Sequence, residues 1–371
     1  MRSRTPESLV RHLHGPGPSP VPPSVLGALA LPVVGHLDPE FVAIMDEVSQ
    51  GLRDLFLTSN RLTFPVSGTG SAGMEATVFN LLEPGDTAVV GAKGVFGARM
   101  AEEVRRAGAD VVVVEGEWGR PIPTERIVEA AKANDAKVVG IVHAETSTGV
   151  RQPIEELRPA LGPDPFLLVD TVTGLGGIPV RVDEWGIDAC YSGTQKCLSV
   201  PPGLAPVTFS DRAVEMISGR TTPVRSWYLD TTLLSAYWDD ADASRAYHHT
   251  APISMVYAIH EGLRMILDEG LGATWARHAE AGRHLQDGLE ARGFALLAPA
   301  EYRLPQLTTA FLPEGLDEGA ARRRLLEEHR IEVGGGLGPF AGRLWRIGMM
   351  GHGATIAAAD RLLAAIDGVI G

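Results

Sequence analysis

Between residues 60 and 210 the chain alternates short apolar runs with segments in which apolar residues recur at helical spacing. Over residues 73–82, for example, Met74, Val78 and Leu81 fall on one face of a helix. The apolar runs are continuous, which is typical of strands in a mostly parallel sheet covered by helices on both faces. We therefore predict an α/β fold with strands at residues 87–90, 111–114, 138–142, 166–169, 189–191 and 206–209.

Beyond Pro252 the pattern becomes that of a smaller α+β unit. Two long helical patterns cover residues 253–269 and 271–292. A strand, a helix and a strand follow, with a turn expected at the glycines of residues 334–336, and a last helix is expected over residues 354–370. The first residues are rich in Pro and Gly, which favours an extended arm. We expect three parts: an N-terminal extended arm (1–23), a large domain (24–252) and a small C-terminal domain (253–371).

Composition and charge narrow the class of protein. An apolar content of 44% in 371 residues indicates a globular chain with a sizeable core. The net charge of −13 argues against sequence-independent binding to nucleic acid or to an anionic membrane. The chain has no apolar run near the ~20 residues that span a bilayer, and no apolar core of a signal peptide. With only two cysteines and no disulfide framework, we expect a cytoplasmic protein.

The residue that points most directly to chemistry is Lys196. It follows an apolar strand and the tight turn of residues 192–194, and it lies 26 residues after Asp170, which ends another apolar strand. A lysine and a carboxylate in these positions fit a Schiff base with pyridoxal phosphate and a partner for the pyridine nitrogen. The alternatives are a solvated surface lysine and an aspartate that caps a turn. A solvated surface position for Lys196 fits poorly, because the residue follows an apolar strand and a tight turn.

A glycine-rich loop over residues 67–73 leads directly into a predicted helix. Backbone N–H groups at the start of a helix, with glycines that permit close approach, suit a phosphate group. Thr69 and Ser71 add hydroxyl groups there. The alternative is a flexible loop with a serine cap.

Three further residues fit the same site. Phe96, between glycines at a strand-to-helix junction, is placed to stack on a flat ring, or is a core residue. Ser147 follows another buried strand and could bond the cofactor or a substrate carboxylate. Arg346 stands alone in an apolar strand, which suits a fork onto a substrate carboxylate, or an internal salt bridge. We expect no metal site at His248 and His249, because neighbours on an extended segment point opposite ways and no third ligand is evident.

With these motifs in place, the chain resembles the class V aminotransferases of fold type I, and within them the alanine–glyoxylate and serine–pyruvate aminotransferase group. The resemblance implies a large domain with a mostly parallel seven-stranded sheet and a smaller C-terminal α+β domain. It covers nearly the whole chain, in ordered blocks at residues 15–19, 81–86, 145–150, 169–177, 191–196, 227–230, 247–250, 335–339 and 346–348.

The resemblance also implies roles for single residues. Lys196 would hold pyridoxal 5'-phosphate and Asp170 its pyridine nitrogen. Val172 would lie under the ring and Phe96 above it. The remaining implied roles are phosphate binding by Thr69, Gly70, Ser71 and Gln195, completion of the phosphate site by Tyr247 and Thr250 from the other subunit of a homodimer, and binding of the substrate carboxylate by Arg346 with Ser147. The sequence departs from the family at Ser71, often His, and at Phe96, often Trp or Tyr.

The resemblance predicts an aminotransferase that works by a ping-pong mechanism. It would move an amino group from alanine or serine to glyoxylate or pyruvate. The alternative is a related class V enzyme that acts on another amine: a pyridoxamine–pyruvate, aminophosphonate or biosynthetic aminotransferase, or a lyase. A desulfurase-like role is disfavoured because Cys197 adjoins Lys196. A scaffolding protein that keeps the fold without catalysis is the alternative from another class.

Overall fold

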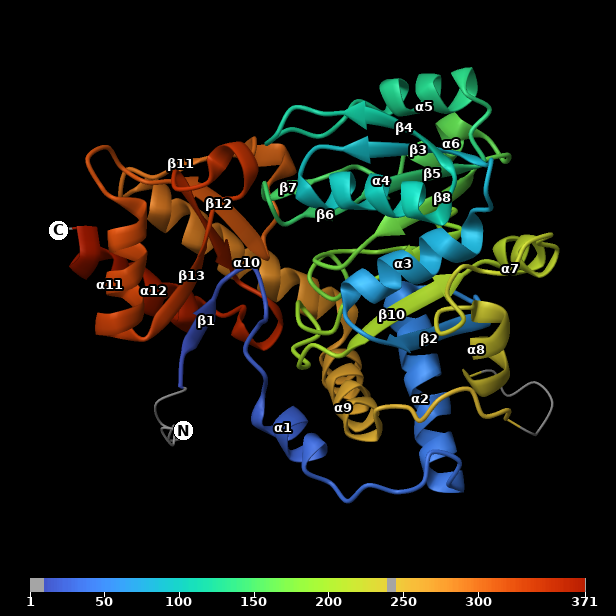
Figure 1. Cartoon of the computed structure of the whole chain (residues 1–371). Helices are drawn as coiled ribbons and strands as arrows, with labels where there is room; N and C mark the ends of the chain where they lie inside the picture. The colour runs from blue at the N-terminus through green and yellow to red at the C-terminus, as the bar shows by residue number, and fades with distance from the viewer. Residues whose placement is uncertain (1–9, 239–244, 371) are drawn as a thin grey trace, which may run out of the picture.

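A seven-stranded sheet forms the centre of the larger part of the molecule, on the right in Figure 1. This computed structural model describes residues 10–238 and 245–370. Five neighbouring strands are parallel, and β10 is antiparallel to both strands beside it. The strand order is β2 (Leu62–Ser67), β10 (Leu204–Phe209), β9 (Ala189–Tyr191), β8 (Phe166–Asp170), β5 (Val138–Val142), β3 (Thr87–Ala92) and β4 (Asp110–Glu115).

The predicted mostly parallel sheet is therefore confirmed, and each of the six predicted runs forms one of its strands. The seventh, β2, was not predicted from the residues. It contains Pro65, which weakens a strand signal because proline cannot donate to the ladder. The sheet tolerates this proline because β2 is an edge strand, with β10 on one side only.

Helices cover both faces of the large sheet. The expected helix at residues 73–82 is α3, which begins three residues earlier and buries most of its length under the sheet. Helix α4 is amphipathic: it buries Met100 and Val104 and ends at Gly108 in the left-handed conformation. The helices around this sheet are α2 (Pro39–Phe56), α3 (Gly70–Leu81), α4 (Val95–Ala107), α5 (Thr124–Ala133), α6 (Leu157–Leu161), α7 (Asp211–Ser218) and α8 (Thr231–Trp238).

A second sheet of five strands, on the left in Figure 1, has the order β1, β13, β14, β12, β11. Three helices pack with it around a separate core that includes Trp345 and Ile347. The strands are β1 (His12–His14), β13 (Ile331–Gly335), β14 (Leu344–Gly348), β12 (Leu307–Phe311) and β11 (Ala295–Leu296). The helices are α10 (Leu271–Glu290), α11 (Glu318–His329) and α12 (Ile356–Ile370). Short elements elsewhere are β6 (Ala144–Glu145), β7 (Val150–Arg151), η2 (Ala300–Tyr302), η3 (Gly338–Phe340) and η4 (Gly351–Gly353).

The prediction of a turn at residues 334–336 was wrong. Gly334 and Gly335 belong to β13 and pair with β14. The glycine at 334 is required by a neighbour, because a Cβ there would lie 2.5 Å from Cδ of Pro16. The glycine run was thus a signal for close approach of another segment, which a single sequence cannot distinguish from a turn.

The N-terminal arm and helix α9 (Ile253–Glu269) both bear on the division into domains. Strand β1 of the arm runs parallel to β13, so the arm joins the small sheet. Helix α9 packs against α1 (Pro23–Leu29) and α2, and its Val256, Ile259 and Leu263 belong to the core of the large sheet. By core membership the large domain extends to about residue 270. The three-part division stays a proposal, with this boundary in place of 252.

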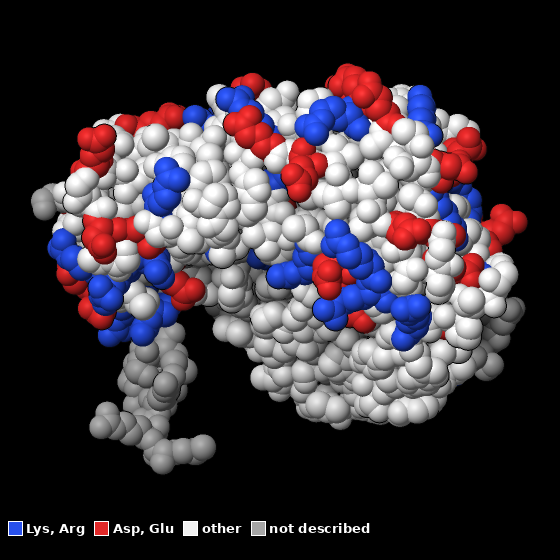
Figure 2. All heavy atoms as spheres, turned by 45° about the horizontal axis from the view of Figure 1, so that its top comes forward, with Lys and Arg blue, Asp and Glu red and all other residues white. Residues whose placement is uncertain are grey.

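Positive and negative side chains are interspersed over the face in Figure 2. Within the described residues, no helix is long and apolar enough to cross a membrane.

His278 joins α10 to the η4 turn and is fully buried. Its Nε2 accepts from the N–H of Gly351 at 2.9 Å, so the ring proton is on Nδ1, which donates to the carbonyl of Thr274 at 2.7 Å. A charged ring would have a proton on both nitrogens and would lose the bond from Gly351. Burial lowers the pKa of His278 to about 4, an effect to which the charge of Arg277 adds.

We predict that His278 makes the fold sensitive to acid. Its pKa is depressed in the folded state, so its contribution to stability is present above the unfolded pKa of about 6.5 and is lost as the pH falls towards about 4. This loss amounts to about 2 kcal/mol at about pH 5. Thermal melts across this range should show a shallower decline for His278→Gln than for the wild type. Parallel declines would contradict the prediction. His14 and His143, whose pKa values burial also lowers, keep some slope in both proteins.

Candidate active site

A cavity of about 140 Å³ opens where the carboxyl ends of β5 and β8 meet the starts of α3 and α4. This is the edge at which open parallel sheets bind their ligands. Eight residues that the sequence singled out line it: Thr69, Gly70, Ser71, Phe96, Asp170, Val172, Gln195 and Lys196.

Asp170 ends β8 and is 2% exposed. Its Oδ1 accepts from the N–H of Val172 at 2.8 Å, and its Oδ2 accepts from the hydroxyl of Tyr191 at 2.7 Å. The alternative role predicted for Asp170, a cap of the turn that follows it, is therefore seen for one of its two oxygens. Burial raises the pKa of this carboxyl to about 6, and the two hydrogen bonds offset part of the effect. A cation beside it, such as a protonated pyridine nitrogen, would hold it ionised.

Lys196 lines the same cavity and lies in the turn after β9. Burial, together with the positive charge of Arg346, lowers the pKa of its amine to about 8. A neutral amine is therefore accessible near neutral pH, as a nucleophile requires. The alternative of a solvated surface lysine was wrong.

The N-terminal arm lies directly on Lys196, which the sequence did not reveal. The amine donates to the carbonyl of Pro16, and Ser19 bonds the backbone of the lysine turn through its N–H to Gln195 O at 2.9 Å and its Oγ to Lys196 O at 2.5 Å. Gly17 has φ +107°, and a Cβ there would lie 2.6 Å from the lysine Nζ. The arm thus restricts where the amine can point.

The start of α3 forms a polar cup in the wall of the cavity. Thr69 is the residue before the helix, and the helix begins with Gly70 and Ser71. A Cβ at Gly70 would lie 3.0 Å from Val172 Cγ2, so glycine is needed for the loop to approach Val172. The buried Oε1 of Gln195 has no hydrogen-bond partner among the described residues. These groups fit an anion such as the phosphate of the predicted cofactor.

Arg346 lies on β14, and its Nε donates to the carbonyl of Gly335 at 2.7 Å. It takes part in no ion pair among the described residues, so the predicted alternative of an internal salt bridge is absent there. Burial lowers the pKa of Arg346, and the charge of Glu145 opposes this effect. The two Nη groups remain available to a carboxylate ligand.

The structure does not place Ser147 on the cavity wall, so the direct bond predicted for it lacks support. Its side chain is fully buried; its Oγ donates to Glu145 Oε1 at 2.5 Å and accepts from Val95 N at 3.1 Å. The neighbouring Thr146 lines the cavity instead. Sequence reasoning missed Glu145, whose only signal was its position at the end of a buried segment.

Tyr247 and Thr250 are exposed and are not part of the cavity in this chain. Between them in sequence, His249 forms a hydrogen bond with Ser67 Oγ at 2.8 Å. This bond joins the segment of residues 247–250 to the end of β2, which precedes the glycine-rich loop. His248 and His249 do not point opposite ways as predicted, because their Nδ1 atoms are 2.9 Å apart. Across the described residues, no group of three His, Cys, Asp or Glu side chains is placed to hold a metal.

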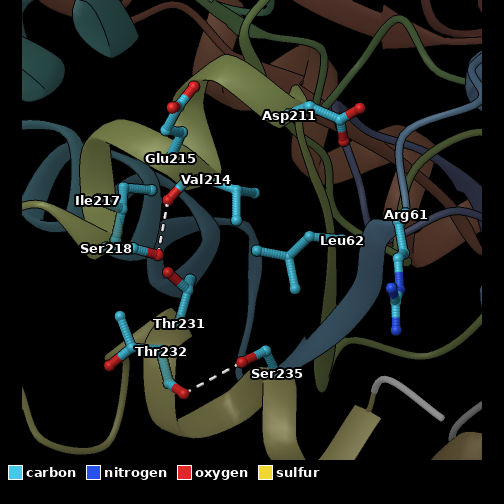
Figure 3. Close-up of a pocket in the computed structure, with 10 residues that line it drawn as sticks. All are labelled: Arg61, Leu62, Asp211, Val214, Glu215, Ile217, Ser218, Thr231, Thr232 and Ser235. Atoms are coloured by element: carbon cyan, nitrogen blue, oxygen red, sulfur yellow. Dashed lines mark hydrogen bonds between the residues drawn. The ribbon is translucent and has the colours of Figure 1, made fainter. Parts of the chain in front are cut away.

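A larger hollow of about 380 Å³ lies between α7, α8 and the start of β2 (Figure 3). It contains none of the predicted site residues. Its hydroxyl groups are used within the protein: Ser218 donates to Val214 O, Ser235 to Thr232 O, and Thr232 to Asp230. It therefore offers no set of groups for chemistry comparable to the cavity around Lys196.

Comparison with known proteins agrees with this site. The family model described as aminotransferase class-V matches residues 13–339. The chain belongs to the class V aminotransferases. It is therefore an enzyme that transfers amino groups, and the resemblance predicted from the motifs is confirmed.

Relatives match this aminotransferase over nearly its full length. The alanine–glyoxylate aminotransferase of Drosophila melanogaster is 40% identical over 96% of this chain and 92% of the relative. The (S)-ureidoglycine–glyoxylate transaminase of Bacillus subtilis (strain 168) is 37% identical over 97% of this chain and 91% of the relative. A solved structure of alanine–glyoxylate aminotransferase from Nostoc sp. matches with a TM-score of 0.95 and 47% identity, covering 100% of this chain and 97% of that one. The predicted fold type I architecture is confirmed.

We predict that the arm is needed to orient Lys196. The change Gly17→Ala adds a Cβ within 2.6 Å of Nζ at a backbone angle that alanine rarely adopts, so we expect at least tenfold slower capture of pyridoxal phosphate by the lysine. The rate at which visible absorbance appears after mixing measures this. Gly15→Ala is the matched control, because its Cβ would have only ordinary contacts at 3.7 Å or more. Equal rates in the two variants would contradict a role for the arm.

Proposed function

We propose that this aminotransferase uses pyridoxal 5'-phosphate to move an amino group from a small amino acid, alanine or serine, to a small 2-oxo acid, glyoxylate or pyruvate, in a ping-pong reaction. The observation that carries the proposal is the cavity that joins the amine of Lys196, the carboxylate of Asp170 and the polar cup at the start of α3. Glyoxylate is the favoured acceptor, because relatives with two different amino donors are both named for it.

The residues of the cavity match the parts of this cofactor. Its aldehyde condenses with amines, and its protonated ring withdraws electrons from the carbon that loses a proton. Asp170, with its pKa raised by burial, would hold the ring nitrogen and keep it charged. Val172 and Phe96, both on the cavity wall, would enclose the ring, and Thr69, Gly70, Ser71 and Gln195 would bind the phosphate.

Lys196 is placed to act as both the attachment point and the proton carrier. With a pKa of about 8, its amine can hold or release a proton near neutral pH. When the amine is free, the carbonyl of Pro16 gives it a hydrogen-bond acceptor at a fixed position. Arg346, without an ion-pair partner among the described residues, would bind the substrate carboxylate and thereby orient the substrate Cα.

The second candidate is the same reaction with another amino donor. The Bacillus subtilis relative named for (S)-ureidoglycine covers this chain as fully as the alanine–glyoxylate relatives do. A solved pyridoxamine–pyruvate aminotransferase from Mesorhizobium loti also matches, with a TM-score of 0.91 and 26% identity. Differences of one small group in a pocket change binding by only about 1–3 kcal/mol, so the donor must be found by measurement.

We predict that the purified protein with pyridoxal phosphate absorbs visible light through attachment to Lys196. Alanine or serine should bleach this absorbance, and glyoxylate should restore it, because the amino group passes through the protein in two half-reactions. A panel of amino donors that includes (S)-ureidoglycine and pyridoxamine identifies the donor. Lys196→Ala should show neither the absorbance nor turnover; wild-type turnover in this variant would refute the proposal.

We further propose that the enzyme is a homodimer in which Tyr247 and Thr250 reach the phosphate cup of the partner subunit. The side chain of Tyr247 is 60% exposed and that of Trp227 is 62% exposed. Large aromatic side chains exposed to this extent favour a surface that a partner subunit covers. The segment of residues 247–250 is held beside the glycine-rich loop by the hydrogen bond between Ser67 and His249. A two-fold axis near this segment would bring it to the partner's cavity.

A subunit-mixing experiment tests this arrangement. Tyr247→Ala/Thr250→Ala protein and Lys196→Ala protein should each be nearly inactive, because each lacks one contribution to every site. After the two are unfolded together and refolded, mixed dimers should regain roughly a quarter of wild-type activity, because half of the dimers contain one complete site. No recovery, with a dimer confirmed by light scattering, would show that the sites are not shared.

A further inference from the structure

Arg99 is an exposed residue beside the cavity. It lies in the second turn of α4 and lines the cavity. Its guanidinium lies 5.0 Å from the centre of the Phe96 ring, and its Nη1 donates to Ser71 Oγ at 3.2 Å. It takes part in no ion pair among the described residues, whereas Arg105 and Arg106 on the same helix both pair with Glu102.

Arg99 lies beside the start of α3 as well as near Glu103 of its own helix, whose raised pKa the charge of Arg99 opposes. Ser71 is the second residue of α3, and the start of a helix carries a partial positive charge from its free N–H groups. The guanidinium therefore adds a full positive charge beside the partial positive charge of the helix start, a combination that suits an anion. Across the cup, Gln195 has a side-chain oxygen that is buried and unpartnered among the described residues. Its amide is therefore free to turn an N–H towards the same point.

The cavity is thus lined by groups of both charges. Beside Asp170, a cation would offset the burial that raises the pKa of its carboxyl. Beside Arg99, the start of α3 and Gln195, an anion would be stabilised. A ligand with a positive ring nitrogen and a phosphate, such as the cofactor of the proposed function, offers a group for each.

We propose that Arg99 binds the phosphate group of the cofactor directly, which adds it to the residues given by the family motifs. This inference rests on the proposed function. The guanidinium presents parallel N–H groups that match two phosphate oxygens, and the Phe96 face below fixes its plane. Phe96 then has two roles, since the ring that borders the cofactor also supports the side chain that neutralises its phosphate.

The test compares two ligands that differ only in the phosphate. Apoprotein is titrated with pyridoxal phosphate and with pyridoxal, and binding is followed by absorbance and by quenching of tryptophan fluorescence. Arg99→Gln should weaken binding of pyridoxal phosphate at least tenfold and leave binding of pyridoxal unchanged. Inorganic phosphate should also compete less well for the variant. Arg99→Lys keeps the positive charge but loses the paired N–H groups of the guanidinium. Its affinity for pyridoxal phosphate should lie between those of the wild type and Arg99→Gln, and it replaces Arg99→Gln in the test if that variant is unstable.

Arg105→Gln is the matched control, because it removes the same charge from the same helix at an exposed position. It should change neither affinity. Equal weakening for both ligands would overturn the inference and show that Arg99 acts on the ring through Phe96. Unchanged affinity for pyridoxal phosphate in Arg99→Gln would overturn it as well. A wild-type protein that binds neither ligand would instead refute the proposed function.

Discussion

The position of Asp170 is the constraint on which the site depends. A carboxylate buried at the end of a central strand is costly unless charge or hydrogen bonds compensate it. Here two hydrogen bonds compensate it partly, and its pKa stays raised. A cationic group of a ligand would supply further compensation, and the sheet fixes where such a ligand would lie: between the strand end, the start of α3 and the turn that carries Lys196. The other cavity residues follow from that geometry.

Much of the fold could be read from the sequence because the signals were local. Continuous apolar runs marked six of the seven strands of the large sheet, and helix α9 has the bounds that periodicity predicted. What failed depended on contacts between distant segments. The edge strand β2 contains a proline, and Gly334 of β13 is explained by Pro16, more than 300 residues away in sequence. The helix after Pro252 joins the large core because of its neighbours α1 and α2.

At the site, too, local sequence signals were recognised, and contacts between distant segments were missed. Lys196 and Asp170 were recognisable because a charged residue at the end of a buried strand, or in the tight turn after one, is rarely buried unless it has a partner. Ser147 was assigned to the cavity from its motif, but Glu145 holds its hydroxyl away from the cavity wall. Arg99 and Pro16 were missed because an arginine on a helix and a backbone carbonyl have no signature in sequence. Only the fold shows that they point to the same place as the lysine.

The N-terminal arm has a consequence for how the protein matures. Its strand β1 pairs with β13, and His14 bonds the carbonyl of Gly348, 334 residues later. The segment between them reaches Lys196. Strand β1 therefore has no docking surface until β13 and β14 have been synthesised, and closing so long a loop is slow. The large sheet can assemble during synthesis, but Lys196 acquires its final surroundings only when β1 meets the small sheet. Completion of the site around Lys196 is then a late event in folding.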